Sequence, residues 1–322
     1  MPSIMIAAIA ASASGLGPGP AKAITGVEAV YTGADGWLSN PGTLGMPSTS
    51  RYLCLSYWWN STNINSISPV FCIGNSVAQR PGSNGTISVL ISHDSGFDGV
   101  SEFAIPSVLV RTGYPDENGV DVSYFPADFN NFASYTHLPY DGEWHWNFLF
   151  IDSVAPQITW LVDGQSLTGY TTIKEGPGGI GTGIPTAMTL SGSSINLFTI
   201  GRFPGPLSTN PSIALVDTGL AELMVFADQQ IDITDSVVQA GFIRPSGDPV
   251  RNGMSGATVF GEDVQPQIYL HNDASIFNKN YKDGGWDTLG NYTDPGSNSF
   301  TVNGTTLVTA TTDPWGGEAS GF

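Results

Sequence analysis

Apolar and polar positions alternate through the middle of this chain in the way that predicts β-strands. A period of two residues recurs in five segments, which are 86–92, 144–151, 158–162, 196–200 and 220–226. In the first of these, Ile87, Val89 and Ile91 share one side of an extended chain. In Trp144–Ile151, the aromatic residues Trp144, Trp146, Phe148 and Phe150 share one side, and several of the segments are apolar on both sides. That pattern predicts a sheet whose two faces are both covered, as in a sandwich with loops packed on its outside.

Turn signals support strands, and helix signals are scarce. Asp163-Gly164 lies between two extended runs and predicts a two-residue hairpin turn. The best helix candidate covers Ile233–Ile243, with Thr234 as its N-cap. The chain has 40 Gly and 22 Pro among 322 residues, and only 12% of its residues are charged. Since Gly and Pro interrupt helices and supply turns, we expect an all-β fold of many short strands.

The same signals divide the chain into three parts. Residues 1–24 form an extended arm with no charge before Lys22, residues 25–248 hold the dense strand signals, and residues 249–322 form a small β-rich, loop-rich extension. The apolar run near the start has no preceding Lys or Arg, which a signal peptide would carry. We expect the arm to dock onto a neighbouring subunit.

The net charge of −18 excludes several partners. It comes from 28 acidic and 10 basic residues without any basic cluster. Nucleic-acid binding and attachment to an anionic membrane both need a basic patch, so we expect neither. Two cysteines, Cys54 and Cys72, lie within apolar runs and are either buried free thiols or a bond between adjacent strands.

Motifs between residues 51 and 243 resemble the laminin-G-like branch of the concanavalin A-like lectin/glucanase superfamily. They follow the family's order: Arg51–Asn60, Asp141–His145 (the "G-x-W-H" element), Ile158–Gly164 (the "v-D-G" hairpin), Phe198–Arg202 and Gly219–Asp228. The resemblance implies an antiparallel jelly-roll sandwich over residues 25–248. It does not by itself imply a function.

Residues 266–304 resemble the segment that follows such domains in structural proteins of tailed bacteriophages. This resemblance implies a virion component, made in the host cytoplasm and placed on the extracellular particle as a capsid decoration or tail-associated protein. Its expected partners are other virion proteins and further copies of the chain. The contact candidates are apolar residues of the arm and aromatic residues of the extension, namely Ile4, Met5, Ile6, Ile9, Trp286, Tyr292 and Trp315.

No set of residues indicates catalysis, so we expect no enzyme activity. Glycosidases of this superfamily carry paired carboxylates on one strand, whereas Glu222 stands alone in an apolar strand. The four histidines are scattered, although His137 and His145 could converge across a loop. We expect no cofactor and no metal, with calcium as the exception to consider, because Asp94, Asp98 and Glu102 gather hard oxygen ligands in an expected loop.

Two other functions stay open beside the virion role. One is a carbohydrate-binding adhesin or receptor-binding module that binds a surface glycan. Tyr57, Trp58 and Trp59 could supply its stacking platform, unless two of them lie in the core and one is exposed by alternation. The other is a divergent glycoside hydrolase that depends on Glu222.

Overall fold

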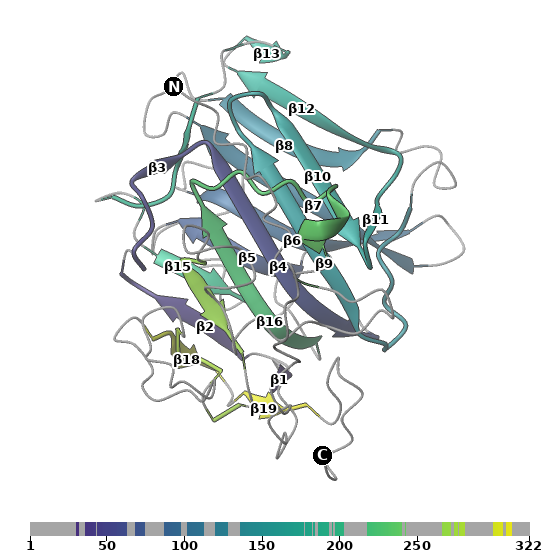
Figure 1. The fold of residues 1–322 in the computed structure, drawn as a ribbon, viewed down its shortest axis with the longest axis vertical. Helices are drawn as coiled ribbons and strands as arrows, with labels where there is room; N and C mark the ends of the chain where they lie inside the picture. The colour runs from purple at the N-terminus through teal and green to yellow at the C-terminus, as the bar shows by residue number, and fades with distance from the viewer. Residues whose placement is uncertain are drawn as a thin grey trace, which may run out of the picture.

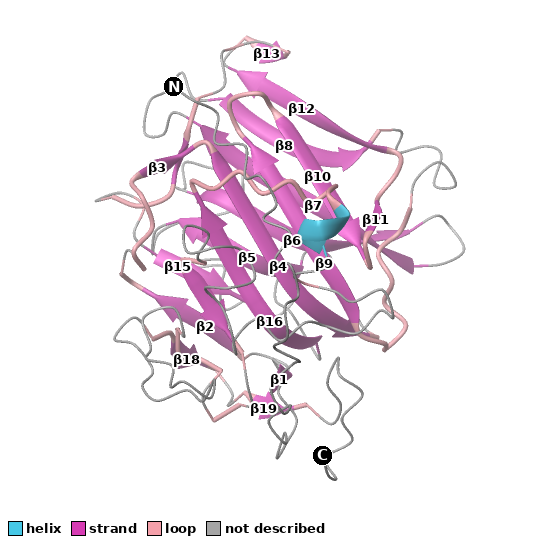
Figure 2. Ribbon diagram, in the orientation of Figure 1, coloured by secondary structure: helices cyan, strands magenta, loops and turns pink. Residues whose placement is uncertain are grey.

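Two antiparallel sheets form the body of the molecule (Figure 1). The structure is a computed structural model. It describes residues 30–31, 36–42, 44–62, 68–74, 87–97, 102–112, 120–127, 136–176, 178–181, 183, 186–192, 195, 197–202, 218–239, 242, 266–271, 274–275, 277–280, 299–304 and 307–310. The expected all-β antiparallel sandwich is confirmed, and Figure 2 shows how fully strands dominate it.

Sheet A is the front layer in Figure 1. In order across the sheet, its strands are β11 (Gln165–Ser166), β10 (Gln157–Val162), β9 (His145–Asp152), β4 (Tyr52–Ser61), β16 (Thr218–Ala227), β1 (Val30–Tyr31) and β19 (Val308–Thr309). β17 (Ile268–Leu270) also pairs with β16, further along the edge that β1 occupies.

Sheet B lies behind sheet A. Its strands run in the order β13 (Gly179–Ile180), β12 (Tyr170–Gly176), β8 (Val120–Pro126), β7 (Glu102–Thr112), β6 (Ile87–Phe97), β5 (Ser68–Gly74), β15 (Leu197–Ile200), β2 (Trp37–Asn40) and β18 (Thr301–Asn303). β14 (Met188–Thr189) pairs with β7 and with β3 (Thr49–Ser50).

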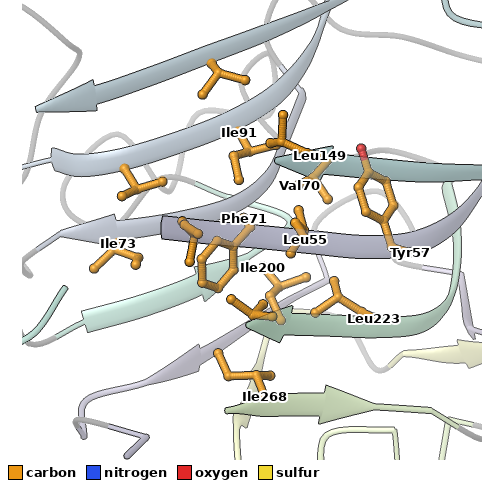
Figure 3. Close-up of a cluster of buried hydrophobic side chains, with 14 of the residues drawn as sticks. Leu55, Tyr57, Val70, Phe71, Ile73, Ile91, Leu149, Ile200, Leu223 and Ile268 are labelled. Carbon is orange, nitrogen blue, oxygen red and sulfur yellow. The ribbon is translucent and has the colours of Figure 1, made fainter. Parts of the chain in front are cut away.

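The main core fills the space between the sheets. Leu55, Tyr57 and Leu149 project from sheet A toward Phe71 and Ile91 of sheet B (Figure 3). Alternation places these residues on the inner faces, because successive side chains of a strand point to opposite sides. The interior is therefore closed by large, fully buried side chains.

The expected hairpin turn forms at Asp163 and Gly164, which both take positive φ values, 50° and 78°. Those values let the turn follow the twist of β10 and β11. The expected helix is much shorter than its sequence pattern: α1 spans only Ser236–Gln239. Thr234, the expected N-cap, lies two residues before the first residue of α1, and its backbone N–H donates to Asp232 Oδ1 over 3.0 Å. The side chain of Asp232 thus bonds the backbone where the first helical turn was expected, and this local hydrogen bond competes with helix formation.

The extension after residue 248 joins both sheets instead of packing apart from them. β17 pairs with β16, β18 pairs with β2, and β19 pairs with β1. Backbone hydrogen bonds of this kind cover edges that would otherwise expose unpaired N–H and C=O groups. Among the described residues, no helix is long and apolar enough to cross a membrane.

Candidate functional site

The outer face of sheet A is closed by a second core. The strap, residues 228–239 and 242, crosses this face and presses Ile231, Ile233 and Phe242 against it. Phe242 packs on three aromatic rings, with its centroid 5.7 Å from Trp146, 4.7 Å from Phe148 and 6.2 Å from Phe226. Covering on both sides explains why β4 and β9 carry buried apolar residues on both of their faces. In the described part of the chain, the strap therefore covers the outward side chains at the centre of this face.

Tyr57, Trp58 and Trp59 form no stacking platform, and the alternative of two core residues with one exposed is also wrong, because all three are buried. Tyr57 and Trp59 project into the main core, and Trp58 projects into the second core. All three are at most 4% exposed. Alternation did send them to opposite faces, but both faces are covered, so none of them reaches a ligand.

Sheet B offers an open outer face along three of its strands. In β8 the inward residues are buried and the outward ones are half-exposed, in strict alternation. The same half-exposure continues on the outward positions of β7 and over most of β12. We call this surface the β7–β8–β12 face. Its outward residues are Ile105, Ser107, Leu109, Arg111, Asp121, Ser123, Phe125, Thr171, Ile173 and Glu175.

The strand register sorts these side chains into rows. Arg111 lies opposite Asp121, which lies opposite Glu175 and makes a charged row. Leu109, Ser123 and Ile173 make a mixed row beside it. Polar and apolar groups thus alternate over a surface that the sheet holds rigid.

One ion pair anchors the charged row. The Arg111 guanidinium donates from Nε and Nη2 to the two carboxylate oxygens of Asp121, over 2.8 and 3.0 Å. Its side chain is 22% exposed and that of Asp121 is 30% exposed. A two-pronged contact of this kind fixes both side chains in one orientation. A second ion pair in sheet A has the same geometry. Arg51, just before β4, donates from Nε and Nη2 to the two carboxylate oxygens of Asp152, at the end of β9, over 2.9 and 2.7 Å.

Asp94, a calcium candidate, lies in a strand and not in the expected loop. β6 runs on to Phe97, so Asp94 takes an outward position beside Ile105 of β7. Burial raises the pKa of its carboxyl to about 6, although the hydroxyls of Ser92 and Ser107 lower it. Asp98 lies outside the described residues, as does the side chain of Glu102. Within the described part of the chain, no group of three or more His, Cys, Asp and Glu residues could hold a metal ion.

Glu222 stands alone in its strand sequence, but the fold brings two other polar side chains to it. It sits at a bulge in β16, with φ of 49°, between the positions that pair with β1 and those that pair with β17. The Tyr269 hydroxyl donates to Glu222 Oε2 over 2.6 Å, and His271 Nδ1 lies 3.7 Å from Oε1. The Glu222 side chain is 4% exposed, so it ties β17 to β16 and does not face solvent.

The histidines do not converge. His137 stacks on Phe103 of sheet B, with centroids 4.2 Å apart, whereas His145 bridges Asp141 and Asp163 at the end of sheet A. His93 is fully buried between the sheets, where its Nε2 lies 2.6 Å from the Tyr57 hydroxyl. The two cysteines are free and buried. The assembly candidates in the arm and the extension, Ile4, Met5, Ile6, Ile9, Trp286, Tyr292 and Trp315, lie outside the described residues and stay predictions.

Sequence reasoning missed the β7–β8–β12 face. The signal was available in Val120–Pro126, where Val120, Val122 and Tyr124 alternate with polar Asp121 and Ser123. A strand with one polar side predicts one solvated face.

Comparison with known proteins gives structural similarities only. No family model matches the chain, and neither does any curated protein sequence. Among solved structures, it is similar to a heptameric SAP-like pentraxin from Limulus polyphemus (12% identity, 65% of this chain and 79% of that one, TM-score 0.38). It is also similar to a candidate carbohydrate-binding protein from Bacteroides ovatus (11%, 88% and 60%, TM-score 0.44) and to domains LG4-5 of the mouse laminin α1 chain (13%, 79% and 49%, TM-score 0.36). The chain spans 60% and 49% of the last two. Since these scores are below 0.5, the sandwich assignment rests on the strand pairing described above.

Proposed function

We propose that this protein is a non-enzymatic carbohydrate-binding sandwich and that the β7–β8–β12 face binds the sugar. One observation carries the proposal: this face is half-exposed and mixed in chemistry, whereas the strap covers the centre of the outer face of sheet A. A site on strands holds its side chains more accurately than a site on loops.

The chemistry of the face matches the two-sided nature of a sugar. A saccharide offers hydroxyl groups around its rim and C–H groups on its ring faces. Arg111, Asp121 and Ser123 supply donors and acceptors for the hydroxyls. Leu109 and Ile173 supply apolar contact for the C–H groups.

Charge favours a neutral glycan. The face carries Asp121 and Glu175 against Arg111, and the whole chain has a net charge of −18. A field of that sign repels uronate, sulfate and sialate groups and slows their approach. We therefore expect neutral oligosaccharides to be bound and anionic ones to be bound weakly.

The position of Glu222 favours binding of a sugar without hydrolysis. Hydrolysis of a glycosidic bond commonly uses two carboxyl groups about 5 to 9.5 Å apart across the bond. Glu222 is buried behind Tyr269, on the other sheet from the proposed face. The virion role predicted from the arm and the extension stays a second possibility, with its contact residues outside the described part of the chain.

The test uses two matched ion pairs. The full chain is applied to an array of neutral and anionic glycans, and a bound glycan is then titrated by calorimetry against Arg111→Ala and Arg51→Ala. A hydrogen-bonded charged group contributes about 1.5–3 kcal/mol, so Arg111→Ala should weaken binding about tenfold or more. Arg51→Ala removes the same kind of pair from the other sheet and should leave affinity unchanged.

Each outcome has a defined meaning. Equal affinity of both variants would place the sugar elsewhere on the molecule. If no neutral glycan binds at millimolar concentration, the carbohydrate proposal fails and the assembly role remains. If the bound glycan is shortened during incubation, the protein is an enzyme, and the non-enzymatic part of the proposal is wrong.

A further inference from the structure

His145 lies between two carboxylates, with one on each ring nitrogen. Its Nδ1 is 2.7 Å from Asp163 Oδ2, and its Nε2 is 3.1 Å from Asp141 Oδ1. We call these three residues the clasp. A neutral imidazole has a single N–H and a lone pair on its other nitrogen. Two carboxylate contacts therefore need the imidazolium form, since a lone pair facing a carboxylate oxygen is repelled.

The two carboxylates are not held equally. Asp163 Oδ1 also accepts the Trp146 backbone N–H over 2.9 Å, and its own backbone lies in the hairpin turn. Apart from its contact with His145, Asp141 accepts a local bond from the Glu143 N–H, and its side chain is 58% exposed, against 41% for Asp163. The Asp163 side of the clasp is thus part of sheet A, whereas the Asp141 side belongs to a surface segment.

That segment, residues 136–144, joins the two sheets, and we call it the connector. At its start, the Leu138 N–H donates to the Ala104 carbonyl of β7 over 2.9 Å, and His137 stacks on Phe103. At its end, it leads directly into β9 through the clasp. Phe103 is an outward residue of β7, so the connector borders the open side of sheet B.

Among the described residues, the connector and the hairpin turn place acidic groups around His145. The connector contributes Asp141 and Glu143, and the hairpin turn contributes Asp163. Strand β4 places the neutral residues Trp59 and Asn60 there, because Trp59 lies opposite His145 in the ladder. Helix α1 brings neutral Gln239 close to Gly164, with Asp235 one residue before the helix. These surroundings favour a positive charge on the imidazole.

We propose that His145 is a proton-operated clasp, which holds the connector against sheet A as an imidazolium and releases its Asp141 side on losing the proton. Burial alone would lower the pKa of His145, but the hydrogen bonds and charges of Asp163 and Asp141 outweigh it and raise the pKa above 6.5. Because the pKa of His145 is raised in the folded state, the clasp contributes its full stability below about pH 6.5. That stability is lost as pH rises through the pKa of His145 in the folded protein. The proposal does not depend on sugar binding at the β7–β8–β12 face.

Two measurements on the full chain test the clasp. Imidazole signals are followed by NMR from pH 5 to pH 9, and backbone hydrogen exchange of residues 136–144 is measured over the same range and corrected for its intrinsic pH dependence. We expect His145 to titrate above pH 6.5, with several-fold faster corrected exchange in the connector above that midpoint. A midpoint at or below 6.5, or corrected exchange that does not change with pH, would overturn the proposal.

Variants separate the clasp from general loosening. Asp141→Asn keeps the histidine but removes one carboxylate, so the midpoint should fall and the connector should exchange fast even at low pH. His145→Gln should abolish the pH dependence of connector exchange. Asp232→Asn changes an exposed aspartate of the strap and should leave both readouts as in the wild type. A connector that behaves identically in Asp141→Asn and the wild type contradicts the proposed release.

Discussion

Acid should destabilise this protein through His93, a histidine sealed inside the sandwich. Its side chain is fully buried, and its ring centroid lies 4.1 Å from that of Trp59. The buried Tyr57 hydroxyl keeps its proton, because burial raises its pKa well above 10, and it shares a hydrogen bond with His93 Nε2 over 2.6 Å. That bond is compatible with the neutral imidazole. Burial lowers the pKa of His93 from 6.5 to about 3.

The size of the effect follows from the two pKa values. Above about pH 6.5 the histidine is neutral in the folded and the unfolded chain, so it contributes no pH dependence. As pH falls from 6.5 toward 3, only the unfolded chain takes up the proton, and stability is lost. At pH 5 the loss is about 2 kcal/mol, and each further unit down to about pH 3 costs about 1.4 kcal/mol more.

Denaturant unfolding at pH 7.5 and pH 5 measures this loss, with His93→Gln as the comparison. The variant cannot titrate, so the wild type should lose about 2 kcal/mol more than the variant between the two pH values. Taking this difference cancels Asp94, whose raised pKa acts with the opposite sign. His145→Gln is the second control: it removes a histidine with a raised pKa, so it should make the acid loss steeper. An equal loss in wild type and His93→Gln would refute the reasoning.

Two further predictions concern the covered faces. Phe242→Ala should lower the free energy of unfolding by about 3–5 kcal/mol, because it empties the aromatic contact that fastens the strap; urea unfolding measures this, and a loss below about 1 kcal/mol would contradict it. Cys54 and Cys72 should resist a thiol reagent in the folded state and both react in denaturant without a reductant, since both are buried and free and burial raises the pKa of Cys54 to about 12. Rapid labelling of either thiol in the folded protein would count against this burial.

Local pattern was a reliable guide wherever neighbouring residues decide the outcome. Alternation placed Ile158, Trp160 and Val162 on one side of β10, and all three lie in the main core. The Asp163-Gly164 pair formed its turn because the required backbone conformation belongs to those two residues. The helix expected over Ile233–Ile243 shrank to one turn, because the strap is positioned by apolar contacts with sheet A and not by helix propensity.

The candidate site was harder to predict, because it depends on what is left uncovered. Side chains point alternately to the two sides in every strand, yet both sides of β4 are buried, whereas one side of β8 is half-exposed. Whether an aromatic such as Trp58 meets solvent or a second core depends on the strap, which follows about 170 residues later in the chain. Likewise, the partner of Glu222 is Tyr269, which reaches it only because β17 pairs along the edge of β16.

The sequence by itself determined the all-β class, the sides on which strand residues fall, the hairpin turn and the absence of a paired-carboxylate motif. These follow from backbone geometry and from residues close together in the chain. Only the tertiary structure decided the order of the strands, the covering of sheet A, the open β7–β8–β12 face and the meeting of His145 with Asp141 and Asp163. Those features depend on which apolar faces pack against one another, and this packing is formed by segments that are far apart in the sequence.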